Sequence, residues 1–195
     1  PLVFGWAYPI IFTPIHIIFF ELIMGPTCSI VYENEPIEPG AMERSPRGMS
    51  KVLFTKQEVS VSVIQGLAIA VGSLFIYRWS AIQSDDGQVV CAMVFTTLCA
   101  ANIGLTLVNR SFEQSVFKTL ADKNNLLVFI LIVSTVLTVF LLTNPAMRSV
   151  FGFAPLSINQ ILLAAGVGLV SVFWFEIYKY FVRTDNKKLR SATAA

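Results

Sequence analysis

Residues 126–142 read LLVFILIVSTVLTVFLL, a run with no charged residue, no Gly and no Pro. The charge-free interval is longer still, because no Asp, Glu, Lys or Arg occurs between Lys123 and Arg148. An α-helix needs about 20 apolar residues to cross a hydrocarbon layer about 30 Å thick. Since the run is continuously apolar and does not alternate, it predicts a transmembrane helix and excludes a strand of a membrane barrel.

Four other stretches of the chain have the same apolar character, and only the first of them holds an acid near its middle. The five predicted spans cover approximately residues 10–31, 59–77, 89–108, 126–142 and 158–181. No repeat and no linker divides them. We therefore expect an all-α fold, a polytopic transmembrane helical bundle that forms one membrane domain over residues 1–195.

The composition of the whole chain supports this fold class. Of the 195 residues, 55% are hydrophobic and 13% are charged, whereas a soluble domain carries about 25% charged residues. A soluble enzyme is therefore excluded, and the lipid bilayer is the expected partner. The net charge of +2 is too small to favour nucleic-acid binding, so no nucleic-acid partner is expected.

The basic residues predict the orientation of the bundle. Twelve of the 14 Lys and Arg residues lie in or next to residues 32–58, 109–125 and 182–195, and only Arg78 and Arg148 lie in the other two loops. Loops rich in Lys and Arg stay in the cytoplasm. We expect two cytoplasmic loops, a cytoplasmic C-terminal tail and an external N-terminal end. The missing initiating Met also suggests a fragment of a longer chain.

One ionisable residue, Glu21, falls near the middle of a predicted span. A charge at such a depth costs about 2.5 to 3.5 kcal/mol on insertion scales and normally faces the bundle interior. Pro26, which follows Gly25, cannot donate a hydrogen bond to the carbonyl of Leu22, so the helix should kink there. A carboxylate beside a free carbonyl suits a hard cation or a proton. Alternatively, Glu21 bonds a neighbouring helix and the Gly-Pro step is only a bend.

Other polar residues offer weaker sites. Met24 and Cys28 lie near the face of Glu21, but one thioether and one thiol do not make a soft-metal site. His16 is expected to be an interfacial side chain near the outer end of the span and not a ligand. Cys28 and the other two cysteines, Cys91 and Cys99, lack metal-binding or disulfide spacing and are expected to be packing residues.

The third predicted span carries a polar stripe on one helical face, formed by Cys99, Asn102, Thr106 and Asn109. Interhelical hydrogen bonds explain such a stripe as well as ion coordination does, and Asn102 is the candidate for function.

Two further patterns predict structural contacts. Glu176 and Lys179, three residues apart, suit an interfacial ion pair. Small residues four apart allow close helix contact, and they occur at Gly66/Ala70, Ala68/Gly72, Ala100/Gly104 and Ala164/Gly168.

The chain holds no catalytic constellation, because it has no P-loop, no GxSxG motif and only one histidine. No catalytic residue and no cofactor-binding residue is therefore expected. An energy source must lie on a missing part of the chain, on a partner or in an ion gradient.

Residues 14–48, PIHIIFFELIMGPTCSIVYENEPIEPGAMERSPRG, resemble the sixth span and following loop of cation-transporting P-type ATPases. That loop carries a Met-Asp/Glu-Arg-x-Pro-Arg signature, matched here with Arg44, Pro46 and Arg47 as structural positions. The later segments FTTL (95–98), NRS (109–111) and FEIYKYFVR (175–183) are similar to the eighth and tenth spans of the same pumps. The resemblance covers nearly the whole chain in the correct order.

This resemblance implies that the five spans are the sixth to tenth helices of a ten-helix pump of the calcium-pump-like bacterial branch. It places Glu21, Met24 and Gly25 at the ion-facing positions of the sixth span and Asn102 at that of the eighth. The aspartate shared by the family is Gly25 here, and a threonine oxygen is the Met24 sulfur. Two calcium ions held by the usual carboxylates are therefore not expected, and the transported cation stays open.

The same resemblance implies partners that these residues do not contain. The phosphorylated segment, the nucleotide-binding and actuator domains and the earlier spans would belong to the same pump, in a bacterial plasma membrane. ATP and Mg²⁺ would bind there and not to this chain. Two alternatives remain: a stand-alone five-span scaffold or subunit of a membrane complex, and a secondary carrier or channel, for which we find no inverted repeat.

Overall fold

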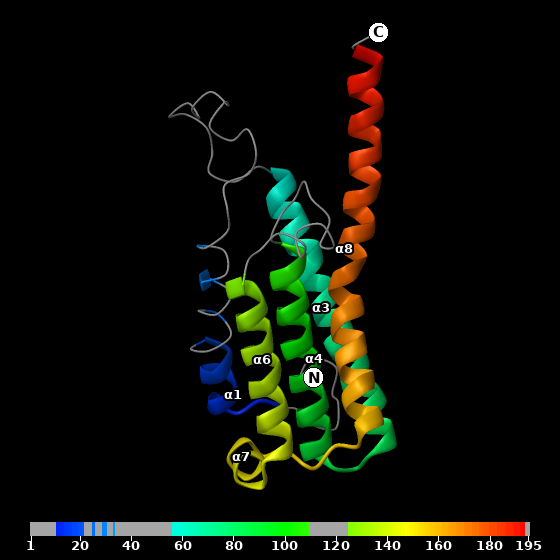
Figure 1. Cartoon of the computed structure of the whole chain (residues 1–195). Helices are drawn as coiled ribbons and strands as arrows, with labels where there is room; N and C mark the ends of the chain where they lie inside the picture. The colour runs from blue at the N-terminus through cyan, green and yellow to red at the C-terminus, as the bar shows by residue number, and fades with distance from the viewer. Residues whose placement is uncertain are drawn as a thin grey trace.

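The structure is a computed structural model that describes residues 11–21, 25, 29–30, 33, 56–109 and 125–193. Every regular element in these ranges is a helix, which confirms the all-α fold (Figure 1). With the labels of Figure 1, the helices are α1 (Pro14–Phe19), α3 (Lys56–Gln83), α4 (Gly87–Val108), α6 (Asn125–Thr143), α7 (Pro145–Phe151) and α8 (Ile158–Thr193).

Four helices are long and apolar enough to cross a membrane, and they coincide with four of the predicted spans. Their apolar segments are Val59–Gln83, Gly87–Val108, Leu126–Thr143 and Ile158–Glu176. Helix α3 continues past the expected end at Tyr77, and α8 continues as one helix through most of the predicted tail. At 1.5 Å per residue, the 36 residues of α8 reach about 54 Å, well beyond a hydrocarbon core.

The first predicted span and the predicted loops are described only in part. Of the first predicted span, 10–31, the structure describes α1 and a few positions after it. Most of the predicted loops 32–58 and 109–125 lie outside the described residues.

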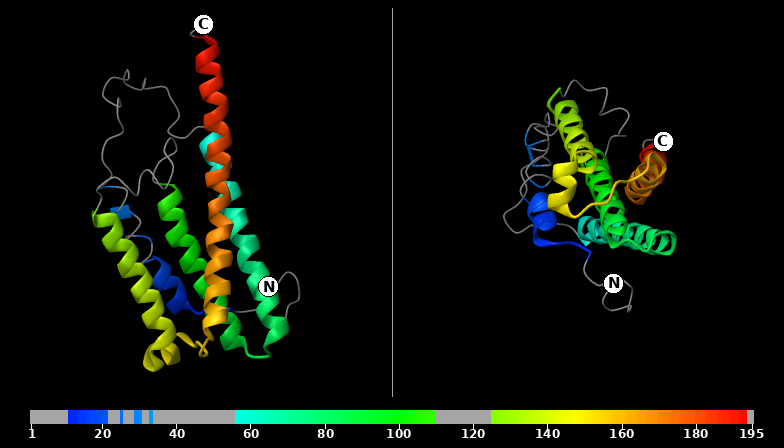
Figure 2. Two further views of the ribbon diagram at one scale, coloured as in Figure 1. Left: turned by 45° about the vertical axis from the view of Figure 1, so that its right-hand side comes forward. Right: turned by 90° about the horizontal axis from the view of Figure 1, so that it is seen from below.

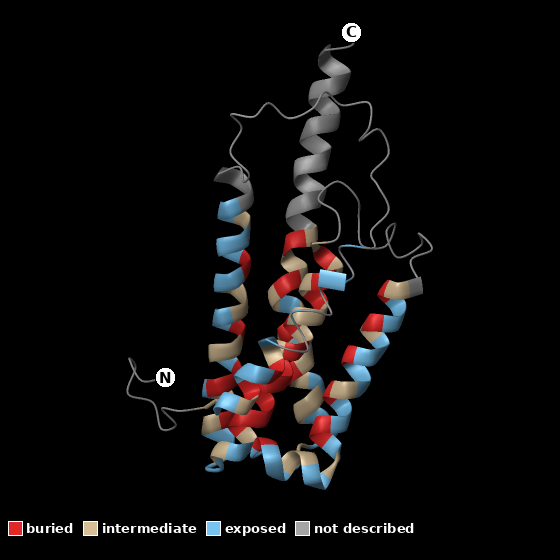
Figure 3. Cartoon of the chain, turned by 90° about the vertical axis from the view of Figure 1, so that its left-hand side faces the viewer, coloured by how far each residue is buried: buried red, intermediate tan, exposed pale blue. Residues whose placement is uncertain are grey.

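Polar and apolar side chains are distributed as a lipid environment requires. Along α3, the apolar residues Val63, Leu67, Val71 and Phe75 recur every four positions and are all more than half exposed. By contrast, Gln65 on the same helix is only 4% exposed. Figure 3 shows this exposed side of α3, with its buried positions confined to the inner face. Because water-soluble proteins do not expose such long apolar stripes, the chain is an integral membrane protein.

Helix α4 is the central helix of the bundle. Of its apolar segment, 72% is buried inside the molecule, against 11% for that of α3. It packs most extensively against α8, then against α3, and also against α6. Seen along the bundle, α4 lies between these three helices (Figure 2).

The contact between α4 and α8 depends on small residues. A Cβ added to Gly168 would overlap the carbonyl oxygen of Thr97 and lie 3.0 Å from the Cβ of Ala100. At the same interface, the hydroxyl of Thr97 donates a hydrogen bond to the carbonyl of Ala164 (3.1 Å). A Cβ on Gly104 would also meet α8, at 3.3 Å from a leucine methyl. The Ala100/Gly104 and Ala164/Gly168 predictions are therefore confirmed.

The two small-residue pairs predicted on α3 have different outcomes. A Cβ on Gly72 would lie 3.2 Å from that of Ser171 on α8, so the Ala68/Gly72 prediction is confirmed at its glycine. A Cβ on Gly66 would meet nothing within 4 Å, and both Gly66 and Ala70 are exposed. The Gly66/Ala70 prediction is wrong for the described part of the chain, because that side of α3 faces outward.

One end of the bundle carries the short connections. Residues 84–86 join α3 to α4, and α7 with residues 152–157 joins α6 to α8 at the same end, opposite the end from which α8 projects (Figure 1). Helix α7 was not predicted. Its signals are Asn144, which accepts hydrogen bonds from the amides of Ala146 and Met147, Pro145 in the first turn, and Gly152, whose φ of 66° ends the helix. We call this end of the molecule the connection end.

Candidate ion-path site

Helix α1 begins with Thr13 as its N-cap residue and Pro14 in its first turn. The α-helix ends at Phe19, and Phe20 after it still has a helical backbone whose amide bonds the carbonyls of His16 and Ile17. The kink predicted at Gly25 and Pro26 stays a prediction, because Leu22 and Pro26 lie outside the described residues.

Glu21 and Gly25 are the two candidates of this segment that the structure describes. Both are exposed in this chain. The nearest described atom to a Cβ added at Gly25 would be the carbonyl oxygen of Phe20, at 3.7 Å, which is an ordinary contact. Met24 and Pro26 lie outside the described residues, as do Arg44, Pro46 and Arg47 of the loop signature.

Asn102, the candidate of α4, is half-buried and turned onto its own helix. Its side-chain amide donates a hydrogen bond to the carbonyl of Leu98 (3.1 Å). Among the described residues, no hydrogen bond joins Asn102 to Glu21 or Gly25, and no group of three or more His, Cys, Asp or Glu could hold a metal ion. Within this part of the chain, the candidates do not assemble into a closed coordination site.

The rest of the predicted polar stripe is used in packing. Asn109 exchanges two side-chain hydrogen bonds with Gln65 of α3, at 2.9 and 3.3 Å. The hydroxyl of Thr106 donates to the carbonyl of Asn102 (2.9 Å), and Cys99 is fully buried in an apolar cluster. Gln65 escaped the sequence analysis, although a lone amide in an apolar span is a signal for an interhelical hydrogen bond.

Helix α1 is anchored at the connection end by His16. The side chain is 1% exposed, so the prediction of an interfacial histidine is wrong. Its ring lies 5.2 to 5.7 Å, centroid to centroid, from the rings of Phe12, Phe95, Phe151 and Phe153. These aromatic residues come from α4, from α7 and from segments beside α1 and α7. Their distance in sequence explains why no local pattern indicated the burial of His16.

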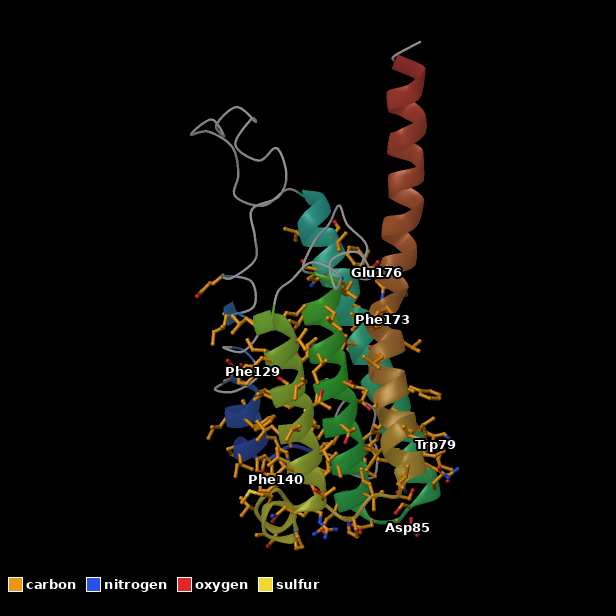
Figure 4. All side chains as sticks on the ribbon, in the orientation of Figure 1. Trp79, Asp85, Phe129, Phe140, Phe173 and Glu176 are labelled. Carbon is orange, nitrogen blue, oxygen red and sulfur yellow. The ribbon has the colours of Figure 1, made fainter. Side chains whose placement is uncertain are left out.

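The remaining predictions concern cysteines and an ion pair. Cys91 and Cys99 are free and buried, as expected of packing residues, and Cys28 lies outside the described residues. Glu176 is half-buried on α8, toward the end from which this helix projects (Figure 4). The side chain of Lys179, its predicted partner, is not among those described.

Comparisons with known proteins agree with this arrangement. A family model for the C-terminus of cation transporting ATPases matches residues 9–181. A calcium-transporting ATPase of Lactococcus lactis is 30% identical over 179 residues, which cover 91% of this chain and 20% of the relative. One of Listeria monocytogenes is 29% identical over 185 residues, again covering 91% of this chain and 20% of the relative. One of Yarrowia lipolytica is 25% identical over 176 residues, covering 88% and 18%.

The match to the family model extends from the segment before α1 into α8, so it includes all of the other described helices and the larger part of α8. The chain spans about a fifth of the length of the curated relatives it matches. The matched family model describes the C-terminal part of these proteins. The chain therefore belongs to the family of cation-transporting P-type ATPases, as a C-terminal membrane domain.

Proposed function

We propose that this chain supplies the sixth to tenth spans of an ATP-driven cation pump and that Glu21 lies on the path of the transported ion. The observation that carries the proposal is the position of Glu21, an acid directly after α1, the first helix of a domain that matches this family over residues 9–181. The relatives are named calcium-transporting ATPases, which supports a cation as the substrate class.

The chemistry of the described residues indicates how much of an ion site this chain can provide. A hard cation such as Ca²⁺ takes six to eight oxygen ligands. Glu21 offers two carboxylate oxygens, and a kink at Pro26 would free the backbone carbonyl of Leu22. Gly25 has no side-chain oxygen, Met24 has only sulfur, and the amide nitrogen of Asn102 is bonded to its own helix. The remaining ligands would come from the other spans of the pump, toward which the exposed carboxylate of Glu21 would face.

The full pump would use ATP and Mg²⁺ through domains that these residues do not contain. In this arrangement, phosphorylation elsewhere moves the earlier helices, and Glu21 is open to one side of the membrane at a time. The α4–α8 contact would be the rigid support against which such motion takes place, because its small residues leave no room for sliding. Residues 42–47, with Arg44, Pro46 and Arg47, would form a structural part of the first cytoplasmic loop.

The basic residues and the fold support one orientation. The connection end holds only Arg78 and Arg148 as basic residues and would face the outside, whereas loops 32–58 and 109–125 and the tail 182–195 would lie in the cytoplasm. A bacterial plasma membrane is the proposed location, since the Lactococcus and Listeria relatives are bacterial.

The test uses the complete pump, purified and assayed for ATP hydrolysis across a panel of cations. We expect one or a few cations to stimulate hydrolysis, and Glu21→Ala to abolish that stimulation. Glu176→Ala is the control: it removes an acid from another span, half-buried on α8, and should lower expression while leaving turnover per folded molecule unchanged. Normal ion-stimulated turnover in purified Glu21→Ala would contradict the site, and tolerance of Glu21→Gln would favour a scaffold role instead.

A further inference from the structure

His16 is the only histidine of the chain, and its hydrogen bonds define the proton on its ring. The backbone amide of Thr13 donates to Nδ1 of His16 (3.1 Å). Because a backbone amide can only donate, Nδ1 must be an acceptor and carry no proton. The neutral ring then carries its proton on Nε2, which lies 3.6 Å from Sγ of Cys91 on α4. The two ring nitrogens thus connect the start of α1 to the central helix.

The bond from Thr13 is a helix cap with an unusual side chain. Glu or Gln is the usual residue at the third helical position, where its side chain accepts from the N-cap amide. His16 takes this position in α1. Unlike Gln, a histidine changes charge near neutral pH, so this cap depends on the protonation state of the ring.

A proton on Nδ1 would break the bond from the Thr13 amide, and Nδ1 could then donate only to the Thr13 hydroxyl, which lies 2.9 Å from it. Two features of the surroundings oppose the resulting cation: the start of a helix, which repels positive charge, and the burial of the side chain. Departure of the ring from its pocket would relieve the buried charge, and α1 would then lose its contacts with α4 and α7.

No acid is placed to stabilise a charged His16 within the described part of the chain. On α4, the group that faces the ring is the thiol of Cys91. Asp86 caps the same helix and accepts from the amide of Gln88 (2.9 Å). On α7, the only charged residue is Arg148, a cation, one turn before Phe151. The charged ring is therefore opposed by burial and supported only by backbone hydrogen bonds with Thr13 and Phe151, of which burial has the larger effect.

We propose that His16 is a positioning residue that acts as a pH-sensitive latch: it holds the connection end of α1, and through it Glu21, against α4 only while its ring is neutral. This inference rests on the proposed function for its effect on transport, but the latch itself is a property of the fold. Acid on the connection side would release α1 and misplace the carboxylate five residues further along.

The experiment follows amide hydrogen exchange of the complete pump in lipid nanodiscs between about pH 7.5 and about pH 5.5, which brackets the titration of an ordinary histidine near 6.5. After correction for the intrinsic pH dependence of exchange, amides of residues 14–21 should exchange up to about tenfold faster at the lower pH, because protonation of one histidine favours local opening by at most this factor over the range. Amides of α3 provide the internal reference. Ion-stimulated ATP hydrolysis is measured on the same samples and should fall over the same range.

His16→Gln separates the latch from simple packing, because Gln keeps the capping acceptor and cannot titrate. Its exchange in residues 14–21 should no longer depend on pH, whereas Glu176→Gln should retain the dependence of the wild type. Equal pH dependence in wild type and His16→Gln would overturn the proposal. If His16→Gln does not fold, the wild type is enough for the test, because pH-independent exchange in the wild type would by itself overturn the proposal. If the wild-type pump shows the exchange response but no ion-stimulated ATP hydrolysis at any pH, the result would instead count against the proposed function.

Discussion

The side chains of Gln65 on α3 and Asn109 at the end of α4 bind each other through both halves of their amide groups. Gln65 Nε2 donates to Asn109 Oδ1 (2.9 Å), and Asn109 Nδ2 donates to Gln65 Oε1 (3.3 Å). Gln65 is almost completely buried. Because each amide satisfies the other, neither helix has to bury an unpaired polar group. The pair lies far from the connection end and holds α3 against α4 at the other end of the bundle.

We expect Gln65→Leu to destabilise the bundle, because it leaves the Asn109 amide without its partner. Interhelical hydrogen bonds in membranes contribute about 0.6 kcal/mol on average, and an unpaired buried group costs about 1 to 3 kcal/mol. Thermal unfolding of the complete protein in detergent should show a loss in this range. Gln83→Leu, at the exposed end of the same helix, is the control and should be nearly neutral.

A double variant makes this prediction specific. Adding Asn109→Leu to Gln65→Leu removes both amides, so the double variant should be less destabilised than the two single variants together. Strict additivity would show that the two amides do not stabilise the bundle as a pair.

Gly168 and Gly166 provide a matched test of the α4–α8 contact, since they lie two residues apart on α8. A Cβ at Gly168 would overlap the Thr97 carbonyl, whereas a Cβ at Gly166 would meet nothing within 4 Å. Overpacking costs about 1 to 3 kcal/mol, so Gly168→Ala should lower the unfolding temperature in detergent. Gly166→Ala should leave it unchanged or raise it slightly, and equal effects would contradict the close approach of α4 and α8.

The sequence predicted the long helices well because the decisive signal is local. A charge-free apolar run needs no partner to indicate a span, and small residues four apart predicted the α4–α8 interface correctly. The same pattern failed at Gly66, because spacing alone does not say which side of a helix faces a neighbour. The burial of His16 was missed for a related reason: its ring contacts come from residues up to Phe153, far away in the chain. The roles of all the site residues, Glu21, Met24, Gly25, Pro26 and Asn102 among them, remain predictions.

The cap of α7 gives a prediction for the connection end. Asn144 accepts from the amides of Ala146 (3.0 Å) and Met147 (3.3 Å), and this helix carries Phe151 of the aromatic group around His16. Loss of an N-cap costs about 0.5 to 2 kcal/mol. Asn144→Ala should therefore lower stability by this amount and speed hydrogen exchange in α1 as well as in α7. Ser149→Ala, at an exposed position of the same helix, should change neither quantity.

Gly25→Asp tests whether the segment after Glu21 belongs to the ion path. The resemblance places an aspartate of the family at this position, and a Cβ here would make only an ordinary contact, 3.7 Å from the carbonyl oxygen of Phe20. The added carboxylate supplies oxygens that a hard cation prefers. In the complete pump, we expect the Ca²⁺ concentration for half-maximal ATP hydrolysis to fall about tenfold, which corresponds to about 1.4 kcal/mol of binding free energy.

Gly25→Asn has nearly the same size without the charge and should produce a much smaller shift. Combined with Glu21→Ala, Gly25→Asp should not restore turnover, because one carboxylate would again face the ion alone. An unchanged Ca²⁺ dependence in a folded Gly25→Asp pump would remove this segment from the ion path.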